Sequence, residues 1–76
     1  MITEAMLKQC RWRAVLFGDG EDGAAFQVRK CVEHPRLTLM WSRKNGTDPG
    51  TSLLAVDGEE VIDLAGAAKR LSEGEP

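Results

Sequence analysis

Few side chains in this sequence are of the types that do covalent chemistry. The chain has one histidine, His34, and two cysteines, Cys10 and Cys31. A Ser-His-Asp or Cys-His mechanism would need His34 as its base, but His34 precedes Pro35 in an expected turn. A strand that ends near this turn would point Cys31 away from His34. We therefore expect a protein that is not an enzyme and has no catalytic residues.

A metal site could be drawn from Cys10, Cys31 and His34. Structural zinc sites use four ligands, commonly as two closely spaced pairs, and only Cys31 and His34 resemble such a pair. The acidic loop at residues 18–23 lacks the ligand spacing and the later glutamate of a calcium loop. We expect no metal and no cofactor. We also expect two free thiols, because two cysteines are too few for the disulfide framework of a small secreted scaffold.

The length of the chain limits its organisation. A chain of 76 residues can build one hydrophobic core, so we expect a single domain over residues 1–76 with a polar tail from residue 72. Stability at this size is marginal, so a partner or a second copy in a homodimer could add to it. No apolar run approaches the ~18 residues of a membrane span, and the N-terminus lacks the order of a signal peptide. We expect a cytoplasmic protein without a membrane partner.

The apolar pattern predicts an antiparallel sheet followed by a helix. Alternation predicts strands over residues 10–17, 24–32, 36–42 and 52–56, and a short strand over residues 59–62 after the Asp57-Gly58 turn. Thr3 can cap a short N-terminal helix. Asp63 can cap a C-terminal helix whose apolar stripe is formed by Leu64, Ala67, Ala68 and Leu71.

The fold class that follows is α+β, with four or five strands and the C-terminal helix packed on one face of the sheet. One alternative concerns residues 59–63, which could instead begin a longer C-terminal helix at Glu59. The Asp57-Gly58 pair favours the strand, because this dipeptide is typical of a tight hairpin turn.

Strand pairing decides which face of the sheet is buried. A shift by one residue moves every side chain of a strand to the other face. Pairing Leu16 with Phe26 and Val28 with Trp41 keeps the apolar rows together across the first three strands. This pairing predicts one core that contains Trp12, Val28, Leu39, Trp41 and Leu71.

The opposite parity would place Cys10 across from Cys31. It would also set Trp12 against Arg29, and burying that pair would remove an arginine from water without a partner. We therefore expect the first pairing, with the two cysteines on opposite sides of the sheet.

The same pairing collects four arginines, Phe17 and Met40 on the face opposite the core. Arginine beside an exposed aromatic or methionine is typical of the centre of a protein interface. A solvated face with arginine stems lying over apolar neighbours would have the same composition. We predict that the residues that bind a partner are Arg11, Arg13, Phe17, Arg29, Arg36 and Met40.

The charge distribution also favours an interaction surface. Residues 1–47 carry eight basic and five acidic residues, whereas residues 48–76 carry two and seven. We expect a small protein-binding module that contacts acidic groups as an inhibitor, adaptor or accessory subunit of a larger machine. Proteins of this size include phage or mobile-element products that block a host machine.

The alternative function is binding of single-stranded nucleic acid by the arginine-bearing face of the sheet. An acidic pI near 5.3 counts against it, because nucleic-acid-binding domains are commonly basic. The absence of tyrosine counts against it as well.

Overall fold

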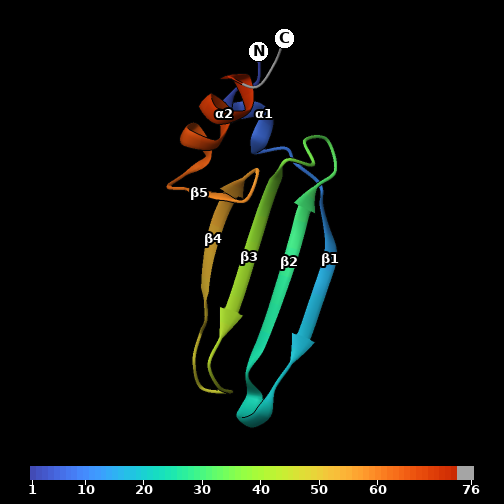
Figure 1. Ribbon diagram of the computed structural model, residues 1–76, viewed down its shortest axis with the longest axis vertical. Coiled ribbons are helices and arrows are strands. Elements are labelled where there is room, and N and C mark those ends of the chain that lie inside the picture. Colours follow the sequence, from blue (N-terminus) through green and yellow to red (C-terminus); the bar gives the residue numbers. More distant parts are fainter. Residues whose placement is uncertain (74–76) are drawn as a thin grey trace.

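The computed structural model describes residues 1–73 and shows an antiparallel meander with a helix before it and a helix after it in the sequence, both at one end of the sheet (Figure 1). The strands lie in sequence order, and every neighbouring pair is antiparallel. The α+β prediction is confirmed, with five strands and both helices. In chain order the elements are α1 (Glu4–Leu7), β1 (Trp12–Asp19), the 3-10 turn η1 (Glu21–Gly23), β2 (Ala25–Cys31), β3 (Leu37–Arg43), β4 (Thr51–Val56), β5 (Glu59–Val61) and α2 (Leu64–Glu73).

Local capping and turn signals set the ends of the elements. The Thr3 hydroxyl accepts a hydrogen bond from Met6 N at 3.2 Å, and Asp63 Oδ1 accepts one from Gly66 N at 2.8 Å. Asp57 and Gly58 have φ of 53° and 81°, as a type I′ hairpin turn requires. Residues 59–61 therefore form a strand, and the alternative of a longer helix is wrong.

The C-terminal helix is longer than the sequence indicated. It continues through Glu73, so the expectation of a polar tail from residue 72 is wrong for Ser72 and Glu73. The Ser72 hydroxyl accepts a hydrogen bond from Ile2 N and donates one to Ile2 O, which ties the N-terminus to α2. The rest of the expected tail, residues 74–76, lies outside the described residues.

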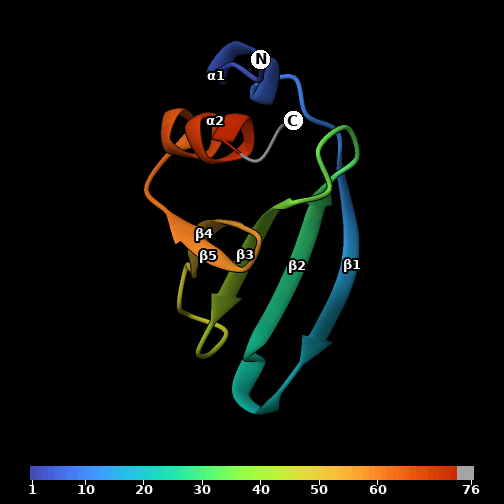
Figure 2. The same cartoon turned by 45° about the horizontal axis from the view of Figure 1, so that its top comes forward.

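The molecule is elongated, and both helices lie at one end of the sheet (Figures 1 and 2). Its extents are 46 × 20 × 20 Å, and its radius of gyration is 13.6 Å. A compact chain of this length would have a radius of gyration of about 11 Å. The sheet therefore extends well beyond the part that the helices cover.

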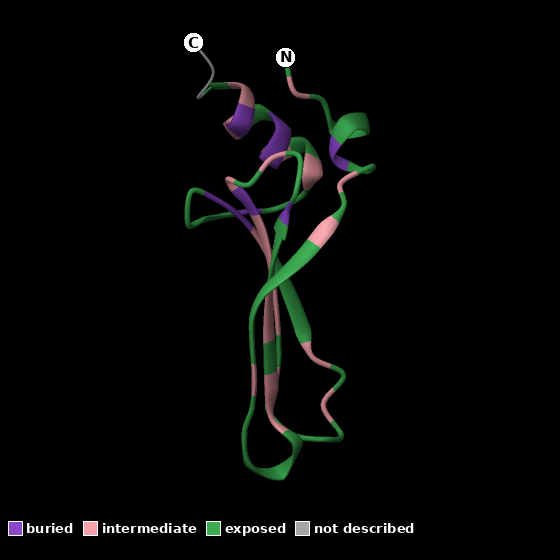
Figure 3. Ribbon diagram, turned by 90° about the vertical axis from the view of Figure 1, so that its right-hand side faces the viewer, coloured by how far each residue is buried: buried purple, intermediate pink, exposed green. Residues whose placement is uncertain are grey.

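The hydrophobic core is confined to the helical end. Figure 3 shows the buried residues at that end only, whereas the rest of the sheet is exposed or half-buried. The partly buried side chains that pack against this core include Trp12 and Leu54. The prediction that Trp41, Val28 and Leu39 share this core is wrong, because all three lie in the uncovered part of the sheet. The buried cluster consists of Leu7, Cys31, Leu37, Val56, Val61, Ala67, Ala68 and Leu71.

The strand register differs from both of the pairings considered for the sequence. Val28 lies opposite Leu16 and Met40, so the predicted pairs Leu16–Phe26 and Val28–Trp41 are wrong. A β-bulge at Val15 shifts the register between β1 and β2 within the strand. Arg29 lies on the same face as the core residues Cys31 and Leu37. It is not buried there, because it lies beyond the helices and its side chain stays in water.

The two faces of the sheet follow from this register, because paired residues point to the same side. The face on which α2 packs is called the helical face, and the other is called the open face. The helical face carries Trp12, Ala14, Phe17, Gln27, Arg29, Cys31, Leu37, Leu39, Trp41, Ser52, Leu54 and Val56. The open face carries Arg13, Leu16, Phe26, Val28, Lys30, Thr38, Met40, Ser42, Leu53 and Glu60.

Candidate functional site

The six residues predicted to bind a partner do not form one cluster. Phe17 and Arg29 lie on the helical face, whereas Arg13 and Met40 lie on the open face. The other two arginines are engaged in ion pairs at the helical end of the molecule. The predicted single cationic face is therefore wrong. The prediction placed Arg13 and Arg29 on one face, whereas Arg13 lies opposite Lys30 and Arg29 lies opposite Ala14.

Arg11 is held by Glu33. Its backbone N–H and its Nε donate to the two carboxylate oxygens of Glu33 at 2.8 and 2.7 Å. These bonds to Arg11 keep the pKa of Glu33 below its ordinary value. Arg11 is thus part of the framework that joins the start of β1 to the turn after β2.

Arg36 has a similar structural role. Its Nη2 lies 2.6 Å from Asp57 Oδ2, and its Nη1 donates to the backbone oxygen of Leu71 at 3.3 Å. The hydrogen bonds from Arg36 keep the pKa of Asp57 below its ordinary value. Arg36 therefore links the start of β3 to the β4–β5 turn and to α2.

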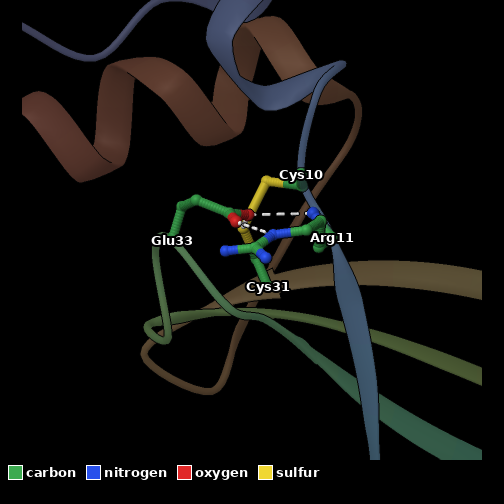
Figure 4. Close-up of a disulfide and its surroundings, with 4 residues drawn as sticks. All are labelled: Cys10, Arg11, Cys31 and Glu33. Atoms are coloured by element: carbon green, nitrogen blue, oxygen red, sulfur yellow. Dashed lines mark hydrogen bonds and ion pairs between the residues drawn. A yellow bond between two sulfur atoms is a disulfide. The ribbon is translucent and has the colours of Figure 1, made fainter.

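Cys10 and Cys31 form a disulfide, so the prediction of two free thiols is wrong. Figure 4 shows the bond beside Glu33, whose Oε1 lies 3.7 Å from Cys31 Sγ. Trp12 pairs with Cys31 across β1 and β2, and this register brings the two cysteine Cα atoms to 5.6 Å. Sulfur and carboxylate atoms of Cys10, Cys31 and Glu33 lie within 4.8 Å of one another, which is metal-ligand spacing. The sulfurs are bonded to each other, however, so they offer no thiolate to a metal.

A shallow hollow lies on the helical face, in the part of the sheet that the helices leave bare. It has a volume of about 350 Å³. Its floor comes from three central strands, and Phe17 stands beside it on β1, in the same cross-strand row as Gln27 and Trp41. We call this surface the docking hollow; it is lined by Gln27, Arg29, Leu39, Trp41 and Ser52.

The indole of Trp41 is fixed from two sides. A Cβ at Gly50 would collide with the indole ring, so the ring lies directly against the backbone there, where φ is +87°. The guanidinium of Arg43 lies 5.7 Å from the centre of the ring, within cation–π range. Arg43 is itself anchored, because its Nε donates to Gly23 O at 2.7 Å. The ring is therefore held in place without being buried.

Phe17 beside the hollow and Arg29 in its lining both face solvent. Phe17 is 74% exposed although it is a large apolar side chain. Arg29 Nε donates to Gln27 Oε1 at 3.0 Å, and no ion pair joins Arg29 to an acidic residue in the described part of the chain. The hollow thus offers an apolar floor, an exposed aromatic ring and a guanidinium available to a carboxylate or a phosphate.

Sequence reasoning identified Phe17 and Arg29 but missed Trp41, Gln27 and Ser52. Trp41 shares one face of β3 with Leu37 and Leu39, and that alternation supported its placement in the core. Only the position of the helices along the sheet shows that Trp41 is uncovered.

Within residues 1–73, no helix is long and apolar enough to cross a bilayer. In comparisons with known proteins, no family model, curated protein or solved structure matches this chain. The case for a function therefore rests on the surface of the molecule.

Proposed function

We propose that this protein is a small non-enzymatic binding module that holds a segment of a partner protein in the docking hollow. The observation that carries this proposal is the placement of Trp41, Phe17 and Arg29 together on a part of the sheet that no helix covers. Tryptophan and arginine dominate the binding energy of protein interfaces when they can be fully desolvated. A fixed tryptophan also loses little conformational entropy on binding, which favours affinity.

The chemistry of the hollow defines the partner segment. An apolar side chain would fill the space over Leu39 and Trp41, and a carboxylate would pair with the guanidinium of Arg29. This combination agrees with a larger protein that presents acidic groups. Inhibitor, adaptor and accessory-subunit roles all use such a surface, and an origin in a phage or mobile element stays a hypothesis based on size.

A cytoplasmic location also stays a proposal, and the disulfide counts against it. Reducing compartments keep most thiols free, whereas a Cys10–Cys31 bond persists in an oxidising one. The proposed binding does not depend on this choice, because neither cysteine lines the docking hollow.

Single-stranded nucleic acid is the second candidate for the same surface. Phe17 and Trp41 lie two strands apart in one row, roughly 10 Å between strand axes, and each could stack on a base. Arg29 and Arg43 could contact phosphates. The acidic tip of the β1–β2 hairpin opposes this candidate, because Asp19, Glu21 and Asp22 would repel a phosphate backbone that continues past the sheet.

Affinity capture from cell extract, with and without nuclease, tests the class of partner. The wild-type protein, Phe17→Ala and Arg29→Glu would serve as baits, with Leu16→Ala as the matched control because its side chain points to the open face. A nuclease-resistant protein that Phe17→Ala and Arg29→Glu lose and Leu16→Ala retains is expected. Recovery of that protein by all four baits would overturn the assignment to the docking hollow.

Titration of the purified partner then measures the effect in solution. We expect Phe17→Ala and Arg29→Glu each to weaken 1:1 binding at least ~10-fold while the melting temperature stays within a few degrees. A parallel titration uses a fluorescent 20-nucleotide oligothymidylate and an oligouridylate of the same length. Tight oligonucleotide binding that both substitutions abolish would replace the protein partner by the second candidate.

A further inference from the structure

The open face carries a continuous apolar row that nothing in the described chain covers. Leu16, Val28, Met40 and Leu53 are neighbours across β1, β2, β3 and β4. Leu16 is 56% exposed and Leu53 is 39% exposed. Exposed apolar side chains that adjoin one another in this way mark interaction surfaces in soluble proteins.

Phe26 extends this row toward the hairpin tip. A Cβ at Gly18, its cross-strand neighbour, would stand 2.5 Å from Phe26 Cε1, so the ring occupies the space over Gly18. The ring therefore bridges β2 and β1 and joins the apolar row to the end of the hairpin.

Two cations adjoin each other near the helical end of the open face, in the cross-strand row that ends at Glu60 of β5. Arg13 lies directly opposite Lys30, and no carboxylate forms an ion pair with either residue within residues 1–73. Like charges directly opposite each other on a sheet are destabilising. At the other end of the same two strands, the tip carries Asp19, Glu21 and Asp22. The β1–β2 hairpin thus has a basic end on the open face and an acidic tip, with the apolar row between them. Asp19 points to the helical face, so the acidic groups of the tip that concern the open face are Glu21 and Asp22 of the turn.

We propose that the open face binds the open face of a second copy of this chain. The two-fold axis would run parallel to the apolar row, perpendicular to the strands and midway between the two sheets. It would place the apolar row of one copy against the same row of the other, with the sheets about 10 Å apart. The strands of the two copies would then run in opposite directions. This arrangement brings Arg13 and Lys30 of each copy toward the acidic tip of the other, and it keeps the helical ends of the two copies apart.

The size of the face sets the expected affinity. Four strands spaced ~4.8 Å apart, over about six residues at ~3.3 Å each, give roughly 400 Å² of flat sheet per copy before side-chain relief is counted. Stable interfaces usually bury about 800 Å² per partner, so this one is small. We expect a dissociation constant in the range of ~10 to 100 µM.

This interface is independent of the docking hollow, because it uses the opposite face of the sheet. Sedimentation equilibrium of the full chain from ~1 to 500 µM tests it. The average mass should rise from the 8.3 kDa of the monomer toward twice that value. A protein that stays monomeric at every concentration would overturn the dimer and leave the proposed partner binding untouched.

Two matched variants locate the interface. Leu16→Glu should raise the dissociation constant at least ~10-fold, whereas Phe17→Glu, the next residue along β1, should leave it unchanged because Phe17 points to the helical face. Leu53→Glu should weaken the dimer as Leu16→Glu does. If Leu53→Glu has no effect, the copies meet along the free edge of β1 and the proposal is wrong.

Charge exchange tests the relative direction of the two copies. Lys30→Glu should weaken the dimer about 10-fold because it faces an acidic tip, and adding Glu21→Lys to the same chain should restore the affinity. Failure of the second substitution to restore binding, with circular dichroism unchanged, would refute the antiparallel arrangement.

Discussion

Arg36 and Asp57 form an ion pair with three side-chain hydrogen bonds at the helical end of the sheet. Arg36 Nε lies 3.0 Å from Asp57 Oδ1, and Nη2 lies 2.6 Å from Asp57 Oδ2. The backbones of the two residues are also joined, because Asp57 N donates to Arg36 O at 3.1 Å. The pair fixes the β4–β5 turn against the start of β3, next to the buried Leu37 and Val56.

This pair predicts a pH dependence of folding. The bonds from Arg36 lower the pKa of Asp57 from its ordinary 3.8, so the folded state favours the ionised carboxylate. The resulting stability is present above about pH 4 and is lost as the pH falls through the lowered pKa of the folded state. The melting temperature of Asp57→Asn should lie below that of the wild type at pH 6, and the difference should shrink on acidification.

Thermal melts between pH 2 and 7 test this expectation. Glu60→Gln is the control, since Glu60 is an exposed carboxyl without an ion pair in the described part of the chain. A difference between Asp57→Asn and the wild type that keeps its full size at pH 2 would contradict the role of the carboxylate.

The position of the core predicts unequal effects of two substitutions in β3. Leu37 is fully buried, at 0% exposure, and Leu37→Ala should destabilise the fold by ~2 to 5 kcal/mol. Trp41 is larger but lies beyond the helices, so Trp41→Ala should cost only about 1 to 2 kcal/mol. Chemical denaturation of both variants measures the order, and a greater loss for Trp41→Ala would place the core elsewhere.

The disulfide predicts a stability that depends on redox conditions. Cys10 and Cys31 are 21 positions apart, and closing a loop of that size stabilises a fold by ~3 kcal/mol in the chain-entropy model. Dithiothreitol should therefore lower the melting temperature of the wild type. The Cys10→Ala/Cys31→Ala double variant should melt at one temperature with or without reductant. A non-reduced mass equal to the reduced mass, rather than about 2 Da lower, would show that the bond is absent.

The sequence allowed the elements to be predicted, but not the faces of the sheet. Alternation along β3, the cap at Asp63 and the Asp57-Gly58 turn are local signals, and each led to the correct element. The pairing prediction assumed that one face is buried along the whole length of every strand. The core covers only the helical end, so Arg29 shares a face with Trp12 without being buried. The parity that puts these two residues on one face therefore does not remove an arginine from water.

Neither the β-bulge nor the disulfide could be predicted from the alternation of apolar residues, and the two reasons are related. No residue type in β1 distinguishes Val15 as an extra residue in the strand. Without the bulge, the register that brings Cys31 opposite Trp12 could not also place Leu16 opposite Val28. The rejected pairing of Cys10 with Cys31 has the parity that is correct at the helical end of the hairpin, but its register differs from the observed one by two residues.

The Arg13–Lys30 pair gives a final prediction about the monomer itself. Because the two cations lie directly opposite on β1 and β2, Lys30→Glu would place a carboxylate across from Arg13. This exchange should raise the free energy of unfolding by ~0.2 to 1 kcal/mol, and Arg13→Glu should have a similar effect.

A double-mutant cycle separates this pairwise effect from the intrinsic preference of each residue. Arg13→Glu combined with Lys30→Glu restores like charges across the strands, so the double variant should lose the gain that each single exchange provides. Chemical denaturation at ~5 µM keeps the chain below the concentration at which copies associate, and the coupling should fall in 1 M salt because both residues are exposed. If the change in unfolding free energy of the double variant equals the sum of the changes in the two single variants, Arg13 and Lys30 do not interact across the strands. The charge argument for the open face would then lose its basis.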